Sequence, residues 1–192
     1  MDSRYDLGSS VVARPRIVDA AARMRDTEDT EVDMTAERVS ELVELLDEAF
    51  VGPRWHALLI NLESVAPDDW LWVAPGGQRS IRDIVAHVGG CKFMYQNQAF
   101  GDGQYTWDTP PVADGDALVT IPAAIDWLRE GHQRLRSSVA ALDDDELPRL
   151  RGHHSGTPRE TRWIIKTMIE HDLYHSGEIN YIRALRQQDD EI

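Results

Sequence analysis

Apolar residues recur at three- and four-residue spacing through most of the chain, and this periodicity limits the fold more than any other feature. The first such segment, within residues 35–51, contains Val39, Leu42, Val43, Leu46 and Phe50. Residues 80–98, 120–142 and 157–187 repeat the pattern, which gives a helix one apolar face. No segment has a convincing strand pattern. The periodicity therefore predicts an all-α fold in which four principal helices pack as a bundle.

Local signals predict where two of these helices begin. Ser80 precedes an apolar period and has Asp83 three residues later, which is the spacing of a capping box, so we expect a helix over 80–98. The stretch from Thr157 to Glu160 has an N-cap threonine, then proline at the first helical position and glutamate at the third. We expect the last helix to start there and to reach about residue 187.

The chain divides by composition into a core region and two acidic ends. Residues 1–34 lack a sustained apolar period and include the acidic stretch 26–31, so we expect a mobile or peripheral N-terminal arm. Residues 35–187 show no composition shift, which predicts one domain. Residues 188–192 form a short acidic tail.

Charge and hydropathy exclude several classes of partner. The formal charge is −14 and the basic residues are scattered, so we expect no nucleic acid partner. No apolar run approaches the roughly 18–20 residues that cross a bilayer, and the acidic first residues do not resemble a signal peptide. Cys91 is the only cysteine, which excludes an intrachain disulfide framework. We therefore expect a soluble cytoplasmic protein.

The most informative motif is a histidine pair, His171 and His175, on the last predicted helix. Residues four apart lie on one helical face, about 5–6 Å apart at Cβ, which suits two nitrogen ligands of one cation. His87 on the 80–98 helix is the best third donor. A single buried imidazole is more often a packed, hydrogen-bonded residue, but the pair makes ligation the better interpretation. Three imidazoles leave coordination positions open, as in catalytic metal sites.

The ion expected at this site is divalent, with zinc as the default and nickel, iron or manganese as alternatives. An open position can take water or a thiol and make it nucleophilic at neutral pH. Glu178 follows His175 by three residues and either orients an imidazole, accepts a proton or lies at the surface. Cys91 lies one turn from His87, and we expect inert packing of its thiol rather than ligation.

Other polar and aromatic residues have simpler explanations. Asp172 takes the glutamate position of an H-E-x-x-H motif, but it is one methylene shorter and no further zincin ligand follows, so a solvated side chain is expected instead of a peptidase. We expect solvent exposure for His153 and His154. The connection over 99–117, which includes Trp107, either shapes a binding site or covers one end of the core.

Two segments together resemble the DinB/YfiT-like superfamily of metal-binding four-helix bundles. The stretch from Pro75 to His87 resembles the family segment that ends in its first histidine, and residues 170–179 resemble its last-helix H-x-x-x-H-x-G-[QE] segment. The resemblance covers about residues 35–187. It implies that His87, His171 and His175 are the metal triad.

The resemblance also suggests a range of activities. Relatives include thiol S-transferases that use bacillithiol or mycothiol and a mycothiol-dependent maleylpyruvate isomerase, and fold alone does not choose among them. Our leading hypothesis is a metal-dependent enzyme that transfers such a thiol, with mycothiol as one candidate co-substrate, to an electrophilic small molecule. The alternatives are a small-molecule hydrolase that uses metal-activated water and a non-catalytic metal-binding or regulatory bundle. Because family members are commonly homodimers, a homodimer is expected.

Overall fold

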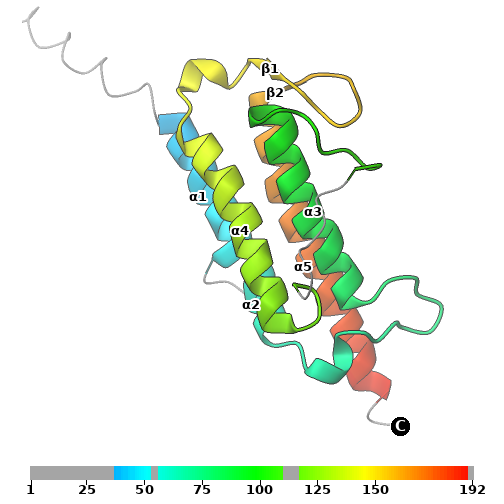
Figure 1. The fold of residues 1–192 in the computed structure, drawn as a ribbon. Helices are drawn as coiled ribbons and strands as arrows, with labels where there is room; N and C mark the ends of the chain where they lie inside the picture. Colours follow the sequence, from blue (N-terminus) through cyan, green and yellow to red (C-terminus); the bar gives the residue numbers. More distant parts are fainter. Residues whose placement is uncertain (1–36, 53–55, 110–116, 190–192) are drawn as a thin grey trace, which may run out of the picture. The chain divides into compact units, whose positions relative to one another are not determined.

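The computed structural model describes residues 37–52, 56–109 and 117–189 (Figure 1). Its helices are α1 (Glu37–Val51), α2 (Leu58–Glu63), α3 (Ile81–Phe100), α4 (Ile121–Ala140) and α5 (Thr161–Asp189), with 3-10 turns at Pro67–Asp69 and Asp144–Glu146. The predicted all-α bundle is therefore confirmed. The expected N-terminal arm, residues 1–34, lies outside the described residues. No helix within the described ranges is long and apolar enough to cross a membrane.

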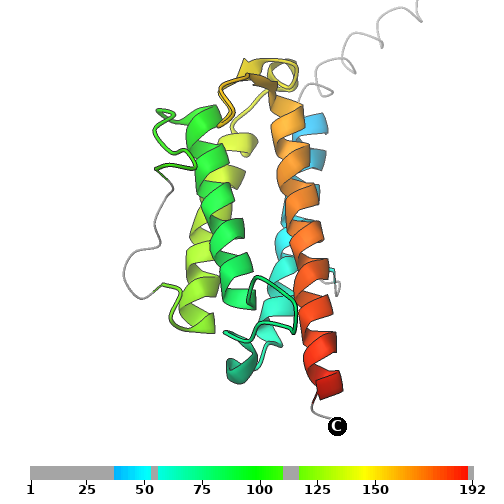
Figure 2. The same ribbon diagram turned by 90° about the vertical axis from the view of Figure 1, so that its right-hand side faces the viewer.

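The four long helices lie lengthwise beside one another, as Figures 1 and 2 show. The neighbouring pairs are α1–α4, α4–α3, α3–α5 and α5–α1, so each long helix contacts two others. The pair α3–α5 carries every residue of the predicted histidine triad. The short α2 packs near the end of the bundle where α3 begins and α5 ends.

The predicted start of α3 is confirmed. Ser80 precedes the helix with extended backbone angles, and its hydroxyl accepts a hydrogen bond from the Asp83 amide at 3.2 Å. The Ser80 amide donates in return to Asp83 Oδ2 at 3.0 Å. This capping box satisfies two amides that the helix itself leaves unpaired.

We expect Ser80→Ala to lower the free energy of unfolding by about 1 kcal/mol, because it removes the N-cap acceptor of α3. Urea denaturation followed by circular dichroism measures the change. Ser137→Ala is the matched control, since Ser137 is exposed in the last turn of α4 and its replacement should stay within about 0.5 kcal/mol of the wild type. Equal effects of the two substitutions would contradict the capping role.

The predicted start of the last helix is wrong by four residues. Residues Arg159–Glu160 form strand β2, which pairs antiparallel with β1 (Leu150–Arg151), so the chain also contains a short hairpin that the sequence did not predict. Gly156 turns the chain with φ of +77°, a backbone conformation that L side chains rarely adopt. The helix then begins at Thr161, whose amide and hydroxyl both donate to the Arg149 carbonyl oxygen.

The apolar interior consists of two clusters with a polar layer between them. The α2-end cluster contains Phe50, Leu58, Leu59, Leu62, Val65, Trp70, Ile81, Ile84, Val85, Val88, Ala124, Ile125, Leu128, Ile179 and Ile182. The hairpin-end cluster contains Val39, Val43, Leu46, Leu135, Val139, Leu147, Ile165 and Met168. Each long helix contributes one polar residue between the two clusters. We define these four residues as the polar layer, which consists of Asp47, Lys92, His132 and Asp172.

The polar layer makes stability depend on pH through His132. Burial lowers the pKa of His132 to about 4, with the Lys92 charge acting in the same direction and the Asp47 carboxylate opposing it. An unfolded histidine has a pKa near 6.5, so between these values the unfolded chain binds a proton that the folded chain does not. The stability that His132 contributes is therefore fully present above pH 6.5 and is lost as the pH falls toward 4.

We expect the contribution of His132 to this loss to be about 1.4 kcal/mol per pH unit. His132→Gln should flatten the fall in unfolding free energy by that amount, because glutamine does not titrate. Urea denaturation at a series of pH values measures both slopes in metal-free protein. Identical slopes for the two proteins would show that His132 does not exclude protons in the folded state.

Candidate metal centre

Two neighbouring helices bring the three predicted histidines together. His87 lies on α3, and His171 and His175 lie on α5. His171 Nε2 is 3.1 Å from His87 Nε2. The His175 ring lies beside both, with ring centroids 5.0 Å from His87 and 4.4 Å from His171. Residues 84 positions apart therefore meet at one point of the α3–α5 contact.

The structure adds Cys91, one turn from His87 on α3, to the donor set. Its Sγ lies 3.9 Å from each nitrogen of the His87 ring. One ligand atom from each of His87, Cys91 and His171 lies within 4.8 Å of the others, which makes these residues a candidate metal-binding group. The thiol is buried, as expected, and burial raises its pKa to about 12. Inert packing of this thiol stays a prediction, because a buried thiol beside the histidines is compatible with packing and with ligation.

The imidazoles of the centre are held neutral. Burial, with the neighbouring His175 and His87 acting in the same direction, lowers the pKa of His171 to about 3. Burial is also the largest cause that lowers the pKa of His87 and of His175. A neutral imidazole has a free lone pair, which is the form that binds a metal ion.

Glu178 and Arg79 fix the orientation of His175. The Glu178 carboxylate accepts a hydrogen bond from His175 Nδ1 at 2.8 Å and one from the Arg79 guanidinium at 2.7 Å. Because Nδ1 carries the hydrogen that is donated in the hydrogen bond to Glu178, Nε2 is the nitrogen with the free lone pair. The sequence left three roles open for Glu178, namely orienting an imidazole, accepting a proton or lying at the surface. The contact with His175 is the one that orients an imidazole. Arg79 was missed, although it lies within the stretch from Pro75 to His87.

This donor set fits a divalent transition-metal ion. Nitrogen ligands lie about 2.0–2.1 Å from zinc, so two of them in a tetrahedral site are about 3.3 Å apart, close to the 3.1 Å between the Nε2 atoms of His87 and His171. His171 Nδ1 is buried and has no hydrogen-bond partner among the described residues. Neutral imidazoles and a thiol suit zinc, nickel or ferrous iron better than magnesium or calcium.

Trp107, in the loop after α3, lies next to His87 and contacts His154 of a second loop. The Trp107 ring is nearly parallel to the His87 ring, with centroids 5.9 Å apart, and its Nε1 donates to His154 Nδ1 at 3.0 Å. The Tyr95 hydroxyl contacts His154 Nε2 at 3.3 Å. The expected exposure of His153 and His154 is wrong, because this packing leaves His153 buried and His154 half-buried. Trp107 itself remains 54% exposed, so one indole face next to the centre is open.

The expected solvation of Asp172 is also wrong. Its side chain is completely buried and accepts a hydrogen bond from Lys92 Nζ at 2.6 Å. Burial raises the pKa of Asp172, and the Lys92 charge opposes that rise. The carboxylate is paired with Lys92, so the similarity to an H-E-x-x-H peptidase motif gains no support from the structure.

A groove of about 400 Å³ is lined in part by Glu178, the residue that contacts His175. Residues 74–79 form one wall, and Glu178, Tyr181, Ile182 and Leu185 of α5 form the other. The volume is within the range of small-molecule sites. The carboxylate that orients His175 is therefore also part of the wall of a groove.

A comparison with protein families agrees with this geometry. A family model described as the DinB superfamily matches residues 53–179, which is 127 of the 192 residues and includes all three histidines, Cys91 and Glu178. No curated protein and no solved structure matches the chain. The match covers well over half of the chain, from the residues before α2 into α5. The chain belongs to the DinB superfamily.

Proposed function

We propose that this protein is a divalent-metal-dependent enzyme that transfers a low-molecular-weight thiol, of the mycothiol or bacillithiol type, to an electrophilic small molecule. The observation that carries the proposal is the approach of His171 Nε2 to His87 Nε2 at 3.1 Å with His175 beside both rings. His87, His171 and His175 are the proposed ligands, with zinc as the default ion and nickel, iron or manganese as alternatives.

Each residue of the centre has a defined part in this proposal. The three imidazoles hold the ion, and Glu178, itself held by Arg79, keeps His175 in its ligating orientation. Trp107 covers one side of His87 and offers a flat apolar face to a substrate. An ion of this kind, when bound, lowers the pKa of a thiol or water at an open position and so supplies a nucleophile at neutral pH.

The position of Cys91 supports a second candidate function. Three histidines leave a coordination position for an external thiol, whereas a fourth protein ligand closes a tetrahedral site. The 3.9 Å separation of Cys91 Sγ from the His87 ring favours this closed arrangement in a non-catalytic, regulatory bundle. A small-molecule hydrolase shares the open site with the thiol transferase and differs only in the nucleophile.

One assay separates these functions. Protein reconstituted with zinc or nickel is incubated with an epoxide, a chloronitrobenzene and an activated ester, each with mycothiol, with bacillithiol and without thiol. A thioether conjugate that depends on the metal and is lost in His171→Ala supports the transferase. Product without thiol supports the hydrolase. Metal-loaded protein that gives no product under any condition contradicts both enzymes and supports the regulatory bundle.

We also propose that the protein is a homodimer. Exposed aromatic side chains on α5 support this proposal, because Tyr174 and Tyr181 are 68% and 66% exposed and lie seven residues, or about two turns, apart on one helix. Light scattering coupled to size-exclusion chromatography measures the mass of the particle in solution. A mass of one chain at all concentrations would contradict the dimer.

A further inference from the structure

A buried ion pair lies directly behind the candidate metal centre. Lys92 Nζ donates to Asp172 Oδ2 at 2.6 Å, and the two side chains are 0% and 1% exposed. Lys92 follows Cys91 on α3, and Asp172 follows His171 on α5. Because neighbouring residues of a helix point about 100° apart, the ion pair and the candidate ligands form two adjacent rows along the same helix–helix contact.

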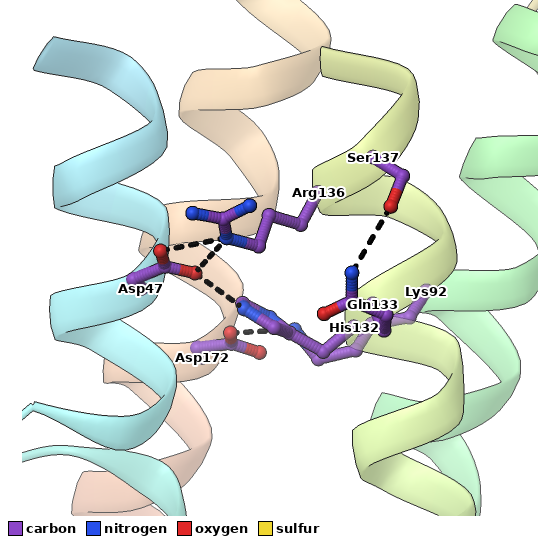
Figure 3. A network of polar contacts seen from close by, with 7 residues as sticks. All are labelled: Asp47, Lys92, His132, Gln133, Arg136, Ser137 and Asp172. Atoms are coloured by element: carbon purple, nitrogen blue, oxygen red, sulfur yellow. Dashed lines mark hydrogen bonds and ion pairs between the residues drawn. The ribbon is translucent and has the colours of Figure 1, made fainter. Parts of the chain in front are cut away.

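Side chains of the other two long helices lie beside this ion pair, and Figure 3 shows the second polar network that they form. On α1, the Phe50 ring lies 4.6 Å from Lys92 Nζ, and on α4 the His132 ring stacks on Phe50 with centroids 4.0 Å apart. His132 Nε2 donates to Asp47 at 2.9 Å, and Arg136 Nε donates to the same carboxylate at 2.8 Å. The polar layer therefore joins α1 to α4 and α3 to α5, and Phe50 lies between these two polar pairs.

Stability alone does not account for such a pair. Burying two charges costs several kcal/mol per ion, and apolar side chains of similar volume often give equal or greater stability. Apolar ridges of two helices pack equally well after a shift of one turn, whereas the contact of Lys92 Nζ with Asp172 Oδ2 at 2.6 Å exists in one register. A shift of one turn moves a helix about 5.4 Å along its axis, which would take these two atoms beyond hydrogen-bond distance.

The same shift would separate the candidate ligands, because they lie on the same two helices. We propose that Lys92 and Asp172 are a positioning pair that fixes the axial register of α3 against α5, so that His87 and Cys91 meet His171 and His175 in a geometry that binds a metal ion. This proposal rests on the metal site of the proposed function. The pair acts through the backbone of the ligands and does not contact the ion.

The test compares Co²⁺ binding by the wild type and by Lys92→Met/Asp172→Leu, which replaces the ion pair by apolar side chains of similar size. The double variant is expected to melt at a temperature equal to or above that of the wild type. Its dissociation constant for Co²⁺ should rise about 10–100-fold, and the visible absorption bands of the bound ion, which report ligand geometry, should change. A purely structural role would leave affinity and spectrum unaltered.

The matched control is Lys166→Met/Glu170→Leu, the same chemical change at an exposed pair on α5 that contains the only other lysine of the chain. It should bind Co²⁺ as the wild type does. If the first double variant does not fold, Asp172→Glu decides, because it keeps the charges and adds one methylene to the contact. Wild-type affinity and spectrum in a folded positioning variant would overturn the proposal. Failure of the wild type itself to bind Co²⁺ would instead overturn the metal site.

Discussion

Purified wild-type protein is expected to contain about one divalent ion per chain, and His171→Ala almost none. His171 Nε2 lies 3.1 Å from His87 Nε2, and burial holds the His171 imidazole neutral by lowering its pKa. Alanine removes one of three proposed nitrogen ligands and leaves a pair that does not define a tetrahedral site. Elemental analysis by mass spectrometry, after gel filtration in a chelator-free buffer, measures the metal content.

His56→Ala is the control for this measurement, because His56 precedes α2 and is not among the candidate ligands. Circular dichroism of all three proteins checks that the helices are retained. Wild-type metal content in His171→Ala would contradict the assigned ligand set. Absence of metal from all proteins, even after reloading with zinc or nickel, would contradict metal binding and leave a bundle without a metal-dependent activity.

Local sequence patterns predicted those parts of the fold that depend on contacts within one helix. The capping box of Ser80 and Asp83 and the shared face of His171 and His175 follow from spacings of three and four residues. The helix start predicted at Thr157 is wrong, because Arg159 and Glu160 pair with strand β1 and this nonlocal contact sets the start of α5. A local signature alone does not reveal such a competing partner.

The polar layer was not predictable for the same reason. Lysine and aspartate are rarely buried, so Lys92 and Asp172 appear in sequence as solvated residues beside apolar ones. Lys92 and Asp172 are 80 residues apart in the sequence, and only the register of α3 against α5 brings them together. Cys91 was correctly expected to be buried, but its distance to the histidines also depends on that register.

The second large effect is expected for the single substitution Lys92→Met, which should lower the free energy of unfolding by about 3–5 kcal/mol. Methionine fills the space of the lysine chain but leaves the Asp172 carboxylate buried without its partner, and Asp172 Oδ1 already has none among the described residues. Urea denaturation measures the loss. Chelator is present throughout, so that metal binding does not add to the stability of either protein.

A double-mutant cycle separates the ion pair from the packing of its side chains. Asp172→Leu alone leaves the Lys92 ammonium buried and should also destabilise strongly, whereas the two substitutions together should restore the unfolding free energy to the wild-type value or above it. Lys166→Met is the control for loss of a lysine, and its exposed position predicts a change within about 0.5 kcal/mol.

A Lys92→Met protein as stable as this control would show that the charge of Lys92 is not buried in solution. Strong loss in both single variants with recovery in the double would instead show that the bundle does not need the ion pair to fold, which leaves the register of the metal ligands as the property that the pair controls.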